Sequence, residues 1–509
     1  MTATASGPGQ GRASSAQLKA TPAQRSQPLA QDSAGTRGAV VSGGVYAAAT
    51  ALQRAVTFLL LPLYTRVLAP AEYGRLAIGL AIFAVASFLL EFGLGLAIYR
   101  NLFQFADDPN KRERFVQSIW SFLLGAPSIA AAFLTVAIFP VLGLHSVITI
   151  VELGLSLLSA ALCVSATTVP FALLRSEQRL REFLILVTIT TVSSTALTLG
   201  LVVGLRDGAT GWLLALAISY GVTLIAAMRV VPYRRPHPYD GGLVIEALRL
   251  SVPVIPHFTA MWALQLADRL LLAALTTVGA VGIYSLASNL AVPMALLVTG
   301  FNQGFMPSYA RAGTSADPSR QLAPLISVQV ALVAIICVAG CLLGPPAVHV
   351  AADARYVKAA GLVGWIILGY AFLGLYSIPM NGVTLTAGQT KRIYLVSIPA
   401  ALANLGLIAG FVPVFGLRAA AVASAAGYAI LLAGVAAYAR VVKSGLRYPW
   451  RRIAPTLAVA AVGYTLTANC VGSASVIDLF VRACCTVVIG VLIARSAGVT
   501  LRMLLRRRS

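Results

Sequence analysis

Long apolar stretches recur along the whole chain and are separated by short polar connections. Fourteen of them hold roughly 20 residues each, enough at 1.5 Å per residue to cross about 30 Å of hydrocarbon as a helix. This pattern predicts an all-α polytopic membrane protein. We expect helices at 39–64, 76–98, 117–142, 147–173, 183–204, 210–230, 244–275, 281–305, 322–344, 359–386, 393–412, 418–440, 453–472 and 476–498.

The basic residues are distributed unevenly between alternate connections. Of the 38 Lys and Arg residues, 28 fall in the N-terminal tail, in alternate loops and in the C-terminal tail. Because Lys and Arg accumulate in cytoplasmic loops, this asymmetry predicts a cytoplasmic membrane protein with both termini inside. The opposite connections hold only seven basic residues, and we expect these outside: Arg66, Arg75, Arg206, Arg355, Lys358, Arg418 and Arg482.

Composition agrees with a membrane protein, since 58% of the 509 residues are hydrophobic and 11% are charged. The net charge of +22 would suggest nucleic acid for a soluble chain, but here it lies in loops beside apolar spans, so we expect no nucleic-acid partner. Residues 1–38 lack any apolar run and are expected to be a disordered cytoplasmic tail without a removable signal peptide.

The six cysteines all lie in apolar spans rather than in exposed loops. Cys337 and Cys341 are one helical turn apart, but no histidine or further cysteine completes a tetrahedral set. The sequence therefore predicts neither a disulfide nor a metal site, and small-hydrophobe packing is the favoured role.

A weak internal repeat appears when the chain is shifted by about 210 residues, which brings AEYGRLA at 71–77 onto VGIYSLA at 281–287. An even number of helices per copy gives two lobes of the same orientation, as in transporters that rock around a central cavity. We expect an N-lobe at 39–231, a C-lobe at 244–442, two extra helices at 453–498 and a basic cytoplasmic tail at 499–509. Chance alignment of Ala-, Leu- and Val-rich helices is the open alternative.

Arg54 is the strongest candidate for substrate binding. It follows about 15 residues of the first span, roughly 24 Å from the cytoplasmic end, where a charge costs several kcal/mol unless it faces a partner or a wet cavity. A guanidinium can bind a phosphate or diphosphate with two parallel hydrogen bonds. Structural pairing with another helix is the alternative. Asn302 and Gln303 are predicted to line the same cavity, with interhelical hydrogen bonding as the alternative.

Four further polar residues at membrane depth are candidates for coupling or gating. Glu91 either relays protons or pairs with a basic loop residue, and His257 lies between Pro256 and Phe258, where prolines loosen the helix. A simple hydrogen bond is the competing role for His257. Asp268 and Arg269, near the outer end of the seventh span, are expected to form a structural or gating pair.

Residues 59–101, LLLPLYTRVLAPAEYGRLAIGLAIFAVASFLLEFGLGLAIYRN, resemble the opening of the polysaccharide-flippase (Wzx-type) family, which is grouped with the multidrug extruders and the lipid II flippases. Similar stretches start at 267 (ADRLLLAALTTVGAVGIYSLA) and at 387 (AGQTKRIYLVSIPAALANLGL), so the resemblance covers both lobes. It implies a V-shaped fold and export of a polyprenyl-diphosphate-linked glycan. It also implies matches of Arg54, Glu91, Arg100 and the Asp268–Arg269 pair to family positions. Fourteen helices resemble the lipid II branch, whose extra pair forms a lipid-tail groove.

Three functions are weighed. The first is a flippase for a lipid-linked oligosaccharide or cell-wall precursor, with membrane lipids and envelope polysaccharide-assembly enzymes as partners. The second is an ion-coupled multidrug exporter, which would favour acids over Arg in its cavity. The third is a membrane glycan polymerase or glycosyltransferase, which would require paired acids on a sizeable outer loop. The chain has no phosphate-binding loop for ATP, so we expect a transporter without a cofactor, coupled to protons or sodium.

Overall fold

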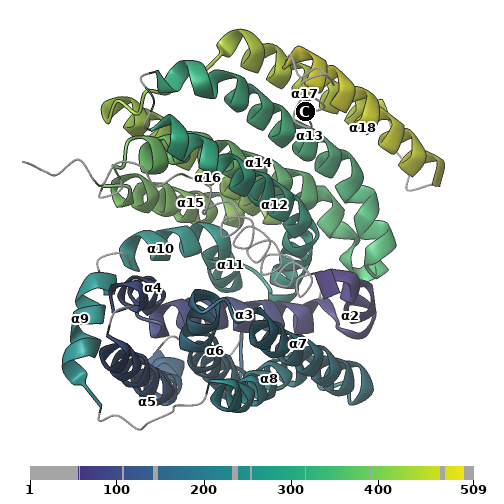
Figure 1. Ribbon diagram of the computed structural model, residues 1–509. Helices are drawn as coiled ribbons and strands as arrows, with labels where there is room; N and C mark the ends of the chain where they lie inside the picture. The colour runs from purple at the N-terminus through teal and green to yellow at the C-terminus, as the bar shows by residue number, and fades with distance from the viewer. Residues whose placement is uncertain are drawn as a thin grey trace, which may run out of the picture. The chain divides into compact units, whose positions relative to one another are not determined.

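Helices and the turns between them form the part of the chain that the computed structural model describes. That part comprises residues 55–56, 58–105, 108–141, 147–231, 239–252, 255–313, 315, 317–389, 392–470 and 476–497. Within these ranges ten helices are long and apolar enough to cross a membrane, and no strand occurs. The predicted all-α fold of a multi-pass membrane protein is therefore confirmed (Figure 1). The number fourteen stays a prediction.

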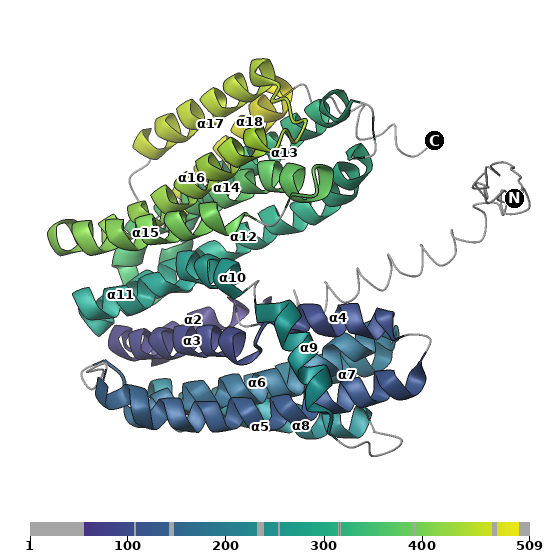
Figure 2. The ribbon, with the colours of Figure 1, turned by 90° about the vertical axis from the view of Figure 1, so that its left-hand side faces the viewer.

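The first group of helices, called the N-lobe below, runs from residue 61 to residue 230. It contains α2 (Leu61–Val67), α3 (Pro70–Leu90), α4 (Leu94–Gln104), α5 (Pro109–Val141), α6 (Ile150–Ser176), α7 (Leu180–Thr198) with the π-helix η3 (Leu199–Gly204), and α8 (Gly208–Val230). Helices α3, α5, α6 and α8 run side by side in two views (Figures 1 and 2). Thr149 caps α6 in a capping box with Glu152, which satisfies two free amides at the start of that helix.

The second group, called the C-lobe below, runs from residue 255 to residue 441, and α9 (Gly241–Ser251) connects it to the N-lobe. It contains α10 (Ile255–Trp262), the π-helix η5 (Ala263–Ala267), α11 (Asp268–Leu275), α12 (Val278–Ala312), α13 (Pro318–Ala351), the 3-10 helix η6 (Ala354–Ala359), α14 (Ala360–Asn381), the π-helix η7 (Gly382–Thr386), α15 (Tyr394–Phe415) and α16 (Leu417–Val441). Two further helices, α17 (Trp450–Cys470) and α18 (Val476–Ser496), pack against α13.

The order of the helices recurs between the two lobes. Helices α3, α5, α6, α7 and α8 begin at residues 70, 109, 150, 180 and 208, and α12, α13, α14, α15 and α16 begin at 278, 318, 360, 394 and 417. Each of these C-lobe helices thus begins about 210 residues after its N-lobe counterpart, which is the shift at which the sequence aligns with itself. Helices α17 and α18 have no counterpart in this series.

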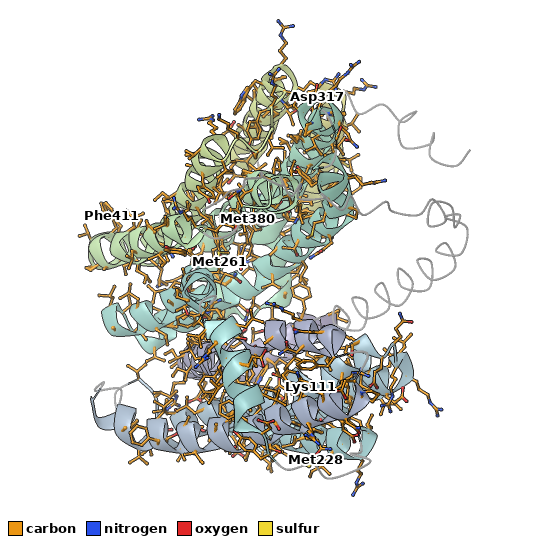
Figure 3. All side chains as sticks on the ribbon, turned by 60° about the vertical axis from the view of Figure 1, so that its left-hand side comes forward. Lys111, Met228, Met261, Asp317, Met380 and Phe411 are labelled. Atoms are coloured by element: carbon orange, nitrogen blue, oxygen red, sulfur yellow. The ribbon has the colours of Figure 1, made fainter. Side chains whose placement is uncertain are left out.

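Contacts between helix ends show which ends lie together. Arg112 pairs with Glu177 at 3.2 Å, and Arg179 donates to the carbonyl of Val230, so the ends predicted to face the cytoplasm meet in the N-lobe. Glu72 accepts from the amide of Ala209 at the opposite ends. We call the ends predicted to face outward the outer ends and the others the inner ends. In the C-lobe, Phe411 and Asp317 lie at these two opposite ends (Figure 3).

Two predicted helices are wrong as continuous segments. The helix expected at 76–98 is broken after α3, where Phe92 and Gly93 have positive φ values of 53° and 67°. Glu91 therefore lies in a turn rather than within a helix. The helix expected at 244–275 divides into α9, α10, η5 and α11. Hydropathy alone does not register such breaks, because the side chains on both sides are equally apolar.

Candidate functional site

Helices α3 and α12 touch at their outer ends without side chains between them. A Cβ on Gly282 would overlap the carbonyl oxygen of Pro70, and a Cβ on Gly74 would overlap that of Val278. Only glycine at both positions allows two helix backbones to approach so closely. Because α3 belongs to the N-lobe and α12 to the C-lobe, this crossing joins the two lobes.

A second set of outer-end contacts joins α2 to η6. The Arg355 guanidinium donates to the carbonyls of Thr65 at 3.2 Å and Arg66 at 3.0 Å, and the Tyr356 hydroxyl donates to that of Leu68 at 3.0 Å. The Arg355 amide and guanidinium bind Asp353 and lower the pKa of that carboxyl group. The last carbonyl groups of a helix have no amide donors from a following turn, and these bonds supply donors for three carbonyls at the end of α2. Together with the glycine crossing, they hold the outer ends of the lobes together.

A cavity of about 440 Å³ lies directly below this closure, between the two lobes. Its polar groups are few. The Asn289 side chain donates to the Tyr73 hydroxyl at 2.7 Å across the lobes, and Trp212 packs on Tyr64 with ring centroids 4.4 Å apart. The lining residues come from α2, the residues ahead of it, α3, α8 and α12: Ala55, Phe58, Leu61, Tyr64, Tyr73, Leu76, Ala77, Leu80, Trp212, Asn289, Val292, Pro293 and Leu296.

Among the described residues, the inner half of α12 continues the cavity-lining face toward an exposed surface. Gln303 lies seven residues, about two turns, after the lining residue Leu296, so the two share a helix face. Gln303 is exposed, and a Cβ on Gly300 or Gly304 would meet nothing within 4 Å. Among the described residues, every hydrogen bond between the lobes lies at Asn289–Tyr73 or closer to the outer ends. The hydrogen bonds that join the described parts of the lobes therefore gather toward the outer side of the cavity.

Asp268 and Arg269 form a buried ion pair in the C-lobe. The Arg269 guanidinium donates to Asp268 Oδ1 at 3.1 Å and to the carbonyl of Gln265 at 3.0 Å, a carbonyl in the π-helix η5. The second carboxylate oxygen accepts from the Tyr284 hydroxyl at 2.5 Å, which in turn lies 3.0 Å from the Ser424 hydroxyl. The pair thus ties α11 to α12 and α16.

The ion pair lies away from water. The side chain of Arg269 is 9% exposed and that of Asp268 is 5% exposed, so water screens neither charge effectively. Helix α11, which begins with these two residues, contacts α3, the helix that contributes Tyr73 to the cavity wall. The structure therefore brings the two predicted residues together in a C-lobe helix that packs against α3.

Asn302 belongs to a different polar cluster. Its Oδ1 accepts from Gln329 at 3.0 Å and from Asn381 at 2.8 Å, and Gln329 also bonds to Ser377 and Tyr309. These residues belong to α12, α13 and α14, so the cluster joins three helices inside the C-lobe. Cavity lining and interhelical hydrogen bonding are the two roles considered for Asn302, and this geometry supports interhelical hydrogen bonding.

Glu91 lines a separate cavity of about 420 Å³ in the N-lobe. The turn that follows α3 directs its carboxylate back toward Gly95. The hydroxyls of Ser87, Thr167 and Thr168 line the same cavity together with Arg175. Glu91 is therefore apart from Asp268 and Arg269. Arg54 and the side chain of His257 lie outside the described residues.

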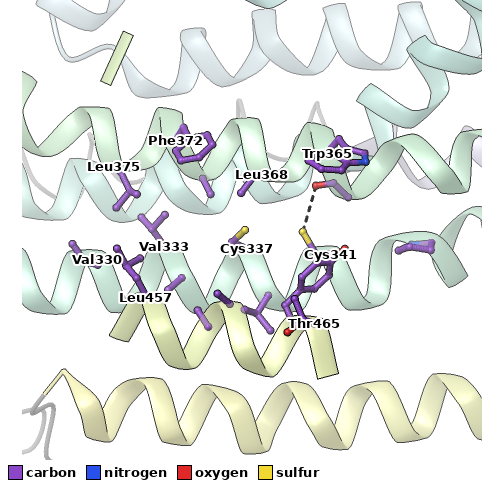
Figure 4. Close-up of a pocket in the computed structure, with 18 of the residues that line it drawn as sticks. Val330, Val333, Cys337, Cys341, Trp365, Leu368, Phe372, Leu375, Leu457 and Thr465 are labelled. Carbon is purple, nitrogen blue, oxygen red and sulfur yellow. Dashed lines mark hydrogen bonds between the residues drawn. The ribbon is translucent and has the colours of Figure 1, made fainter. Parts of the chain in front are cut away.

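An apolar groove of about 530 Å³ runs between α13, α14 and α17 (Figure 4). Along α13 it extends from Val330 to Pro345, which is roughly 22 Å at 1.5 Å per residue. Cys341 faces the groove and its Sγ lies 3.4 Å from the carbonyl of Gly364. Cys337 is a neighbouring lining residue, and both cysteines are free thiols.

Sequence analysis missed the residues that make the closure and the groove. Gly74, Gly282, Tyr73 and Asn289 are ordinary membrane-helix residues when read singly. The signal that could have identified the glycines is the repeat itself, because the shifted stretch AEYGRLA begins three residues before Gly74 and VGIYSLA contains Gly282. Arg355 appeared only as one of the few basic residues of the outer loops.

Comparison with known proteins adds a family and a fold. The sequence profile of the family described as polysaccharide biosynthesis protein matches residues 40–312. The comparison with curated protein sequences returned no match.

Several solved structures share this helical arrangement. The lipid II flippase MurJ in an inward closed conformation has a TM-score of 0.70 and 12% identity, over 88% of this chain and 97% of that one. An inward-facing multidrug resistance MATE family transporter of the MOP superfamily gives 0.59 and 14%, over 76% and 94%. A MATE protein in the straight conformation gives 0.53 and 15%, over 80% and 96%. These likenesses show the fold.

Proposed function

The chain belongs to the polysaccharide biosynthesis protein family, and from this premise we propose that it moves a lipid-linked glycan precursor between the leaflets of a membrane by alternating access. The observation that carries the proposal is the cavity between two lobes whose hydrogen bonds to each other, among the described residues, lie at the cavity or closer to the outer ends. A head group enters such a cavity from the inside, and rocking of the lobes would release it outside.

The cavity between the lobes and the apolar groove differ in chemistry, so we propose that they bind different parts of the substrate. The cavity carries polar groups at Tyr73 and Asn289 and takes the diphosphate and sugar, while the groove beside α17 is apolar and takes the prenyl tail. Arg54 precedes the lining residue Ala55 in the chain, and we keep it as the proposed diphosphate ligand, with Gln303 as a further polar position of the C-lobe. The MurJ likeness favours a cell-envelope precursor as substrate.

We further propose that the protein works in the cytoplasmic membrane with both termini inside, as a transporter without catalytic chemistry or bound cofactor. Envelope polysaccharide-assembly enzymes are its proposed partners, because a flipped glycan must be polymerised or transferred on the other side. His257, Asp268 and Arg269 remain proposed gating residues. The hydrogen bond that links the Asp268–Arg269 pair to Tyr284 of α12, and through it to Ser424 of α16, supports that role.

A flipping assay tests this function. Purified protein is placed in vesicles that hold undecaprenyl-diphosphate-linked N-acetylglucosamine with a nitrobenzoxadiazole label on the sugar. Dithionite added outside bleaches about half of the label when no flipping occurs, and we expect nearly complete bleaching when the protein is present. Fluorescence decay is the measurement, and labelled phosphatidylethanolamine is the control that should stay half protected.

Two outcomes would contradict this function. If the labelled glycan lipid stays half protected while the protein is folded, it is not a flippase for this substrate class. If the same vesicles instead accumulate ethidium under an ion gradient, the multidrug alternative holds.

Glu91 is our proposed coupling residue, because it is a carboxylate in an N-lobe cavity with three hydroxyls around it. A proton gradient of about one pH unit supplies about 1.4 kcal/mol per proton, a tenfold bias. We expect this gradient to accelerate flipping by the wild type and to have no effect on Glu91→Gln, which keeps the size and loses the titrating group. The partly exposed carboxylate Glu182, which is paired with Arg179, provides the control variant Glu182→Gln. If the proton gradient still accelerates flipping by Glu91→Gln, Glu91 is not the coupling residue. If only a sodium gradient accelerates flipping by the wild type, sodium and not the proton is the coupling ion.

A further inference from the structure

One arginine lines the outer end of the apolar groove. Arg418 is the second residue of α16, is exposed, and lines the groove together with residues of α13, α14 and α17. Its guanidinium lies 5.9 Å from the centre of the Trp365 ring. A second arginine nearby, Arg482, is paired with Asp478 and donates to the carbonyl of Leu342. No carboxylate of the described residues forms an ion pair with Arg418. Its hydrogen-bond donors are thus available to a ligand.

The surroundings of Arg418 are apolar on both sides. On one side lies the groove, and on the other a hollow of about 400 Å³ between α15 and α16, which Arg418 also lines. The other groove residues are aliphatic, aromatic or small, apart from the hydroxyls of Tyr464 and Thr465 and the thiols of Cys337 and Cys341. A ligand that fits this arrangement has one anionic end and one long apolar end, which is the chemistry of a phosphate-bearing lipid.

We propose that Arg418 binds the diphosphate of the polyprenyl carrier at the outer end of the groove, while the prenyl tail lies along α13 and α17. The site would hold the lipid after its head group has crossed, before release into the outer leaflet. This inference rests on the proposed function. The planar guanidinium suits a diphosphate because it donates two parallel hydrogen bonds, and its place above Trp365 fixes its orientation.

The carrier fits the site better than a bilayer phospholipid for two reasons. A diphosphate carries more than one negative charge, whereas the phosphodiester of a phospholipid carries one, so an unpaired guanidinium favours the former. The groove is also a single apolar channel along α13, which suits the one chain of the carrier rather than the two acyl chains of a phospholipid.

Binding of undecaprenyl diphosphate to the purified full-length protein, followed by native mass spectrometry, tests the site. We expect Arg418→Gln to weaken binding about tenfold, the loss of one charge-assisted contact. Arg206→Gln is the matched control, since Arg206 is also an exposed arginine at an outer end but lies away from the groove. Phosphatidylglycerol is the competing probe and should bind weakly and equally to all three proteins.

A second pair of variants tests whether the prenyl tail binds in the groove. A side chain at Gly364 would project into the groove, where only the Tyr464 hydroxyl lies near, at 3.8 Å from the added Cβ. Gly364→Leu should therefore weaken binding of undecaprenyl diphosphate, whereas Gly406→Leu should not, because Gly406 has open space around it on α15 outside the groove.

Unchanged binding by Arg418→Gln, or failure of the wild type to bind undecaprenyl diphosphate, would overturn the assignment. An equal loss of phosphatidylglycerol would also overturn it and make this a site for bilayer lipid. The flipping assay distinguishes failure of the Arg418 site from failure of the proposed function. A wild type that flips while Arg418→Gln binds normally removes only this site, and a wild type that binds through Arg418 but does not flip removes the proposed function.

Discussion

Gly282→Ala should prevent the outer ends of the two lobes from closing. The added methyl group would overlap the carbonyl oxygen of Pro70, which is backbone and cannot rotate away. Overpacking of this kind costs about 1–3 kcal/mol, so the equilibrium constant for closure should fall about 5-fold to 150-fold. Because inward-facing binding needs this closure, flipping should fall by a similar factor.

Gly279→Ala is the matched control, one turn away on the same helix. There the added Cβ would lie 3.9 Å from the nearest atoms of Pro70 and Ala71, an ordinary contact. Alanine improves helix propensity by about 1 kcal/mol at either position, so intrinsic propensity cannot explain a loss that occurs only at Gly282.

Spin labels at Arg66 and Lys358, in a background without the six native cysteines, report the separation of the outer ends. The distance distribution should widen toward longer values in Gly282→Ala alone. Identical distributions for the two glycine variants would show that the crossing does not control closure.

Hydrophobic length and the distribution of Lys and Arg were sufficient to predict the membrane fold and most helices. Helices such as α8, expected at 210–230 and found at Gly208–Val230, need only a continuous apolar run, and burial of the backbone in lipid leaves no other structure available. Breaks such as Phe92–Gly93 depend on backbone conformation and on the neighbour, here Ser251 near Gly93, and neither is visible in hydropathy.

The candidate site was harder to predict from the sequence, because charged residues in apolar spans can be recognised there and close packing of helices cannot. Asp268 and Arg269 stand out as charges at membrane depth, and the structure brings them together in one ion pair. Asn302 stands out as a polar residue at membrane depth, yet its partners Gln329 and Asn381 lie on helices whose rotation cannot be read from an evenly apolar pattern. The groove arises from three helices and a single cation, Arg418, so no short motif marks it.

Asp268→Asn should be the most destabilising polar substitution among the described residues of the C-lobe. It keeps the size of the side chain but leaves the Arg269 charge buried without its counter-ion, and breaking such a pair costs about 3–5 kcal/mol. The Tyr284 hydroxyl exchanges its charged acceptor for a neutral amide oxygen at the same time, so the link from α11 to α12 and α16 is weakened. We expect a lower Tm in detergent and a reduced yield of folded protein.

Comparison with three further variants distinguishes the charge from the hydrogen bonds. Tyr284→Phe should have a smaller effect, because it removes a hydrogen bond and leaves the ion pair intact. Asp268→Asn combined with Arg269→Met should regain part of the lost Tm, because no isolated charge then stays buried. Glu182→Gln breaks an exposed pair and should leave the Tm almost unchanged. If the double variant is less stable than Asp268→Asn, the pair acts through its hydrogen bonds to Gln265 and Tyr284 and not through charge compensation.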